Sequence, residues 1–169
     1  RGYERLMELE RVTTKNGTFF EYNTPTYSRV THDALTRIAR HTENKEAAIR
    51  ARALRARLAL TAALHLHTAT GVWAGPHGRG FTLSGDKAAP EQRSMFDRWI
   101  ADGNAPFCFA EMLKLPLPYS VWESVAPALG VGIMTYLDDA VAMGTATAEI
   151  SRQSHVFLVH AKGGAGGSG

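Results

Sequence analysis

The longest regular pattern in the sequence runs from Asn44 to His67 and predicts one helix of about 24 residues. At 100° per residue, its apolar side chains fall on two nearly opposite sides. One side holds Ile49, Ala53, Ala56, Leu60, Leu64 and His67, and the other holds Leu54, Leu58 and His65. A helix that is apolar on two sides packs between neighbours, so the pattern predicts a layered helical array.

The rest of the chain predicts shorter elements around this helix. Helices are expected at 3–12, 31–40, 90–101, 109–114 and 119–129, with Thr31 as a cap and a long loop at 68–85. Strands are expected at 132–137, 141–147 and 155–161, with a turn at Asp138-Asp139. The predicted organisation is therefore a helical part at 1–130, a strand region at 131–162 and a flexible glycine-rich tail at 163–169.

Charge and cysteine content exclude several classes of function. Lysine and arginine number 19 against 16 aspartate and glutamate, an excess too small for a nucleic-acid-binding surface. No apolar run approaches the length of a membrane span. Cys108 is the single cysteine, which rules out an internal disulfide and a cysteine-based zinc site. His65 and His67 are two positions apart on a predicted helix, point about 160° apart, and cannot share a metal ion. We expect no metal and no cofactor.

Two segments carry the side chains with the most chemistry. Residues 21–27 (EYNTPTY) place two phenols, an amide and a carboxylate just before a helix. Residues 74–81 (AGPHGRGF) present a histidine and an arginine between glycines that allow close backbone approach. Polar groups on loops held by rigid helices are a usual way to build a functional site. Trp73 adjoins the second segment and is the best of the three tryptophans for stacking on a sugar.

These two segments also carry a family resemblance, over roughly residues 18–160. An E-Y-N-T-P-T-Y segment, a helical hairpin and then a W-A-G-P-H-G-R loop resemble the (α/α)-toroid proteins, which are broadly similar to heparinase II/III-type and other polysaccharide lyases. Thr135-Tyr136-Leu137, followed by residues 142–146 (AMGTA), is similar to the place where such proteins leave the toroid for a β-sandwich.

The resemblance implies a mainly α fold, in which antiparallel helical hairpins of a toroid are followed by a few strands. It also implies that this chain is a fragment of a larger protein, with more hairpins before it and more of a sandwich after it. A secreted or periplasmic location follows from the resemblance alone.

The residue types are compatible with cleavage of a uronic-acid polymer by β-elimination. That reaction needs a group to neutralise the substrate carboxylate, a base for the C5 proton and an acid for the leaving oxygen. Asn23 is assigned to the first role, and His77 or Tyr27 to proton transfer. Arg79 would hold an acidic sugar, with Tyr22 and Trp73 as further substrate-binding residues. The alternative is that Tyr22, Asn23 and Tyr27 only tie an irregular segment to the helices.

Two functions are therefore expected: a lyase-like enzyme acting on acidic polysaccharide, or a non-catalytic glycan-binding or structural helical module. They differ in whether Asn23, Tyr27, His77 and Arg79 converge. The helical hairpin predicts that Asn23 or Tyr27 lies within about 10 Å of His77 or Arg79 in a shared cleft. The strand at 155–161 is expected to be an exposed edge through which copies self-associate.

Overall fold

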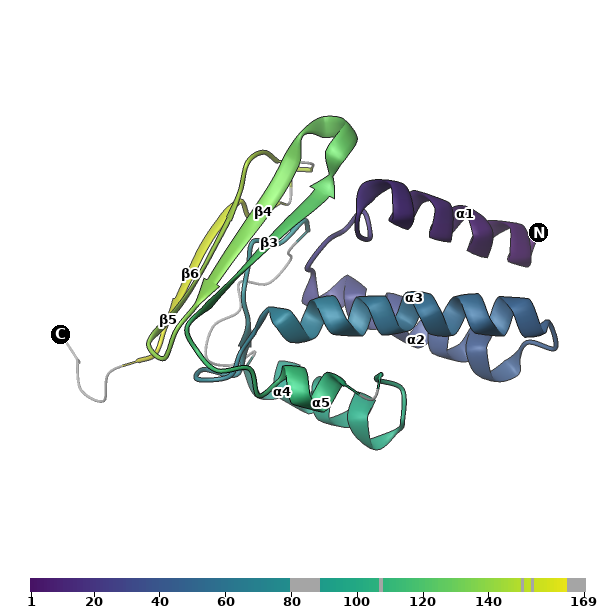
Figure 1. Cartoon of the computed structure of the whole chain (residues 1–169), viewed down its shortest axis with the longest axis horizontal. Helices are drawn as coiled ribbons and strands as arrows, with labels where there is room; N and C mark the ends of the chain where they lie inside the picture. The colour runs from purple at the N-terminus through teal and green to yellow at the C-terminus, as the bar shows by residue number, and fades with distance from the viewer. Residues whose placement is uncertain (80–88, 107, 150, 153, 164–169) are drawn as a thin grey trace.

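The computed structural model describes residues 1–79, 89–106, 108–149, 151–152 and 154–163, and it shows a mixed α/β fold. A layer of helices stands beside a four-stranded antiparallel sheet (Figure 1). The expectation of a mainly α toroid is wrong, because the helices pack against one face of a sheet instead of continuing as a ring of hairpins.

The elements follow one another along the chain as helices and then strands, with a short β-hairpin between the third and fourth helices. The helices are α1 (Gly2–Asn16), α2 (Pro25–His41), α3 (Lys45–Leu64), α4 (Ala89–Ala101) and α5 (Phe109–Met112). The strands are β1 (Leu66–His67), β2 (Val72–Trp73), β3 (Tyr119–Ala126), β4 (Val131–Leu137), β5 (Val141–Ala146) and β6 (Phe157–Ala161), with a 3₁₀ turn, η1 (Pro127–Leu129), after β3. None of the helices in the described residues is long and apolar enough to cross a membrane.

Helices α2 and α3 form the predicted hairpin, but α2 begins earlier than expected. Its first residue is Pro25 rather than a residue near Thr31, because proline suits the first helical turn, where its missing N–H needs no partner. Asn44 caps α3 by accepting a hydrogen bond from the backbone N–H of Ala47 at 3.0 Å. The first helix, α1, ends at Asn16, four residues later than predicted, and Gly17 follows it with a φ of 85°.

The burial of α3 is one-sided, which differs from the predicted two-sided packing. Its buried residues are Ala47, Ala48, Ala51, Leu54, Leu58, Ala59, Ala62 and Ala63. On the other side Ile49 is 60% exposed. Alanines on the buried side let α1 and α2 approach closely, and Leu6, Leu35, Leu54 and Leu58 form one core cluster there.

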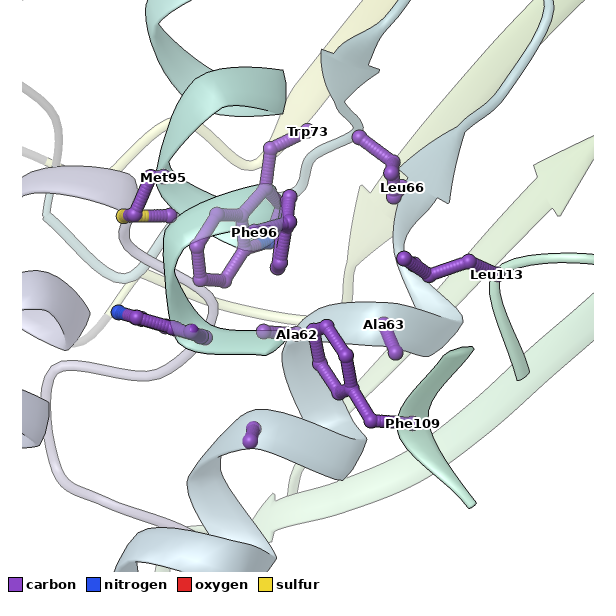
Figure 2. Packing of buried hydrophobic residues seen from close by; sticks show 10 residues of the cluster. Ala62, Ala63, Leu66, Trp73, Met95, Phe96, Phe109 and Leu113 are labelled. Atoms are coloured by element: carbon purple, nitrogen blue, oxygen red, sulfur yellow. The ribbon is translucent and has the colours of Figure 1, made fainter. Parts of the chain in front are cut away.

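A second core cluster surrounds the end of α3 and the β1–β2 hairpin. The helix ends at Leu64 and not at His67 as predicted, because Leu66 and His67 pair with Trp73 and Val72 of the region expected to be a loop. Figure 2 shows Trp73 and Leu66 from the hairpin, Phe96 from α4 and Phe109 from α5 gathered over the alanines at the end of α3. The rings of Trp73 and Phe96 lie 5.3 Å apart. Residues 80–85 of the expected loop lie outside the described residues.

The four strands of the main sheet run in the order β3-β4-β5-β6. In β4, buried and half-buried residues alternate, so one face packs on the helical side and the other faces outward. The three strands predicted at 132–137, 141–147 and 155–161 are confirmed. The helix predicted at 119–129 is wrong, because residues 119–126 pair with β4 as strand β3. Strand β6 is the last in this order, so the strand predicted at 155–161 lies at an edge of the sheet, as expected.

Candidate functional site

The two segments singled out in the sequence lie against each other. His77 Nδ1 donates to the backbone carbonyl of Asn23, and the N–H of Gly78 donates to the carbonyl of Tyr22 at 2.9 Å. The N–H of Arg79 donates to Thr24 Oγ1 at 3.2 Å. The predicted proximity is therefore confirmed, since the start of α2 and the segment after α3 share one end of the hairpin. Asn23 and His77 do not face the expected shared cleft, because they are only 4% and 3% exposed.

Asn23 is buried at the centre of this contact, and its amide is fully occupied. Its Nδ2 donates to the carbonyls of Ala74 at 2.9 Å and Pro76 at 2.8 Å. Its Oδ1 accepts from Trp73 Nε1. The φ of Asn23 is 47°, a left-handed conformation that asparagine tolerates better than most residues. With 4% exposure and three hydrogen bonds, the side chain joins the helical hairpin to the following segment.

His77 is buried on the other side of the same segment. It forms an isolated antiparallel bridge with His155, whose carbonyl accepts from the N–H of His77 at 3.1 Å. Burial, together with smaller contributions from the nearby His155 and His160, lowers the pKa of His77 to about 4. The ring is therefore neutral at pH 7, and its Nδ1 proton is held by Asn23 rather than offered to a ligand.

Gly75 lies directly on the inner face of the sheet. Its carbonyl accepts a hydrogen bond from the buried Thr135 Oγ1 at 2.8 Å. A Cβ built on Gly144 of β5 would lie 1.9 Å from the same carbonyl oxygen, so only glycine permits this approach. The segment 74–79 is therefore clamped between Asn23 and the sheet.

Tyr22 and Trp73 are both buried, Trp73 in the second core cluster and Tyr22 in a further cluster at the sheet. Tyr22 packs among Val125, Val131 and Ile133, and burial raises the pKa of its phenol. Its hydroxyl has no hydrogen-bond partner among the described residues. Trp73 is 1% exposed, so its ring offers no open face for a sugar in this structure.

Tyr27 and Arg79 are the two candidates that reach the surface. Arg79 forms an ion pair with Glu21 at 2.5 Å, and its guanidinium lies 4.7 Å from the centre of the Tyr27 ring. The side chains of Arg79 and Glu21 are 35% and 33% exposed. The ion pair with Glu21 raises the pKa of Arg79 above its ordinary value, so the cation persists at every pH of interest.

An open hollow of about 250 Å³ lies beside Tyr27 and Glu21, and we call it the aromatic hollow. It is lined by Leu9, Phe19, Phe20, Glu21, Tyr27, Ser28, Thr31 and Leu58. Phe20 is 54% exposed and forms part of this lining. Sequence reasoning missed Phe20, Ser28 and Thr31; the phenylalanine pair directly before Glu21 was the available signal.

The remaining buried histidines have separate partners. His67 contacts the carbonyl of Asp138 at 2.6 Å and Thr70 Oγ1 at 2.7 Å. His65 Nε2 lies 3.3 Å from the Glu123 carboxylate, and its Nδ1 contacts the carbonyl of Thr61. Within the described part of the chain, no three His, Cys, Asp or Glu side chains are grouped to hold a metal ion.

Comparison with known proteins found no protein similar to this chain. No family model matches the chain, and no curated protein or solved structure matches it either. The likeness to polysaccharide lyases therefore stays a sequence-based expectation, and function has to be argued from the geometry of the site.

Proposed function

We propose that this chain binds carbohydrate, and that the aromatic hollow is where a sugar ring rests. The observation that carries this proposal is the composition of the hollow. It combines the exposed ring of Phe20, the phenol of Tyr27 and the carboxylate of Glu21 in one open depression. Small-ligand sites have this character: a mainly apolar and aromatic lining with a few polar groups that fix orientation.

Each part of the hollow has a chemical counterpart on a sugar. The C–H face of a pyranose is apolar and packs on an aromatic ring, whereas its rim of hydroxyls needs hydrogen-bonding partners. Glu21 accepts from hydroxyls, and the Thr31 hydroxyl both donates and accepts. The volume of about 250 Å³ is below the range of roughly 300–1,000 Å³ typical of enclosing pockets, which favours contact with one or two rings of a chain that runs on beyond it.

The geometry favours binding over turnover. Asn23 and His77, two of the three residues assigned to catalysis, are buried and hydrogen-bonded within the protein. Neither can reach a substrate in the aromatic hollow without breaking contacts that hold residues 74–79 in place. The alternative expected from the sequence, a glycan-binding module without turnover, is therefore the better supported function.

Calorimetric titration with soluble oligosaccharides, neutral and uronic, tests the proposal. We expect at least one class to bind, and Phe20→Ala or Tyr27→Ala to weaken that binding about tenfold, or ~1.4 kcal/mol. Phe157→Ala is the matched control, because Phe157 on β6 is similarly exposed, at 62% against 54% for Phe20, and lies outside the hollow. Absence of binding to every oligosaccharide, or equal loss in the control, would overturn the proposal.

Lyase-like activity on an acidic polysaccharide is the second candidate, and one observation favours it. Tyr27 and Arg79 stand together at the surface, so a phenol able to move a proton lies beside a cation able to hold a uronate carboxylate. The substrate carboxylate would have to compete with Glu21 for Arg79. Absorbance of an unsaturated product from uronic-acid polymers measures this activity, and Tyr27→Phe should abolish it.

A further inference from the structure

The face of the four-stranded sheet that is turned away from the helices is largely apolar and uncharged. Figure 1 shows the helices on one side of the sheet only. Alternation along each strand and the pairing between strands place eleven side chains on the other side, which we call the outer sheet face. They are Ser120, Trp122, Ser124, Met134, Tyr136, Val141, Met143, Thr145, Phe157, Val159 and Ala161. Not one of the eleven carries a charge.

Large side chains stand out from this face at both edges of the sheet. Trp122 on β3 is 75% exposed and Phe157 on β6 is 62% exposed. Strand pairing sets Trp122 opposite Met134, Met134 opposite Thr145, and Thr145 opposite Phe157, so all four form one row across the sheet. An exposed apolar area of this extent marks an interaction surface more often than ordinary solvent-exposed surface.

The same face also holds a depression. A hollow of about 370 Å³ lies beside Trp122 and is lined in part by Gly132, Met134, Thr145 and Thr147. It arises because Gly132, Thr145 and Thr147 are smaller than the neighbouring Trp122 and Met134. The outer sheet face therefore carries both a projecting ring, Phe157, and a hollow next to another ring, Trp122.

We propose that a second copy of this chain packs on the outer sheet face, sheet against sheet, about a two-fold axis. A two-fold interface uses one patch on both copies, so the patch must be complementary to itself. The outer sheet face meets this requirement, since Phe157 of one copy can enter the hollow beside the other copy's Trp122 while the reverse contact forms across the axis. Two antiparallel sheets stacked in this way, about 10 Å apart, form a β-sandwich.

Size and charge agree with a second copy. Four strands about 4.8 Å apart, each roughly six residues long, give a face of about 20 Å by 20 Å. The protruding rings raise the accessible area to about 600 Å² per copy, or about 1,200 Å² in all, which reaches the lower limit for stable interfaces. The chain as a whole carries a net charge of +3, but the outer sheet face brings no like charges together.

Sedimentation of the whole chain from about 1 to 100 µM tests this inference. We expect a monomer–dimer equilibrium, and Phe157→Lys or Trp122→Lys should weaken it at least about tenfold, or ~1.4 kcal/mol. Phe20→Lys is the matched control, because Phe20 is similarly exposed but lies in the aromatic hollow. Circular dichroism verifies that each variant stays folded, which is expected because the substituted side chains are exposed.

A further variant separates face packing from edge pairing. The N–H of Ala146 donates to the carbonyl of Val156, and the N–H of Lys162 donates to the carbonyl of Ala140. Backbone N–H groups point to alternate sides along a strand, so the N–H of Ala161 points away from β5. Ala161→Pro therefore blocks pairing at this edge but leaves the rings in place. Loss of the dimer in Ala161→Pro alone would overturn face packing in favour of the edge. A monomer at every concentration, or a dimer that both lysine variants leave intact, would also overturn it.

Discussion

The side-chain oxygen of Asn23 accepts a hydrogen bond from the indole Nε1 of Trp73, 50 positions further along the chain. This bond joins the segment before α2 to strand β2, in the hairpin after α3. The amide nitrogen of Asn23 binds two carbonyls of the same segment, so a single side chain holds residues 73–76 against the helical hairpin.

Replacing Asn23 should destabilise the protein strongly. Asn23→Gly leaves the carbonyls of Ala74 and Pro76 and the indole N–H buried without a partner, at an expected cost of about 3 kcal/mol. Asn23→Ala should cost about 1 kcal/mol more, because alanine resists the φ of 47° that glycine accepts. Urea denaturation at pH 7 measures both. Equal stability of the two variants would contradict the backbone part of this prediction.

Stability should fall as the solution becomes acidic, because two buried histidines are neutral in the folded state. Burial lowers the pKa of His32 to about 4, and burial likewise lowers the pKa of His77 to about 4. A pKa below the unfolded value of 6.5 means that the unfolded chain binds protons first. The stabilisation is therefore complete above pH 6.5 and is lost as the pH falls toward 4, by about 2 kcal/mol per histidine at pH 5.

The variant His32→Phe isolates one of these contributions. The His32 ring stacks on Trp99 with centroids 3.9 Å apart, and phenylalanine can keep this stacking without titrating. The free energy of unfolding, measured between pH 7.5 and pH 5, should then vary less with pH than in the parent. An unchanged pH dependence would show that protonation of His32 does not contribute.

Two glycines on neighbouring strands should respond differently to alanine. A Cβ at Gly144 would lie 1.9 Å from the Gly75 carbonyl oxygen, so Gly144→Ala must push residues 74–76 off the sheet and cost at least about 2 kcal/mol. At Gly132 the nearest atom would be 3.6 Å away, an ordinary contact, and Gly132→Ala should change stability by less than about 0.5 kcal/mol. Thermal unfolding of both variants tests the contrast.

The hydroxyl of Thr135 should contribute more to stability than that of Thr145. Thr135 is fully buried and donates to the Gly75 carbonyl, so Thr135→Val should cost about 1–2 kcal/mol by leaving that carbonyl without its partner. Thr145 is half-exposed on the outer sheet face, and Thr145→Val should be neutral within about 0.5 kcal/mol. Denaturation at low protein concentration is the measurement, and a similar cost for both would count against the clamped position of Gly75.

Local signals in the sequence predicted much of the secondary structure. Asn44 before an apolar run, Gly17 after one and Asp138-Asp139 between two β-rich segments mark ends and turns that depend on a few neighbouring residues. The sequence also singled out the segments at 21–27 and 74–81, because unusual polar and glycine-rich stretches stand out locally. Their proximity followed from the short connection between two helices.

Only the tertiary structure decided what those residues do. Residues 119–126 form a strand because they pair with β4, and the local sequence of 119–126 does not indicate that pairing. The residue types of Asn23, His77 and Trp73 are the same whether they lie on a surface or in a core. In the folded chain they are buried against distant partners, and their hydrogen bonds join the helices to the sheet. Hydrogen bonds and packing between residues 50 or more positions apart depend on the folded chain, so composition and spacing could not reveal them.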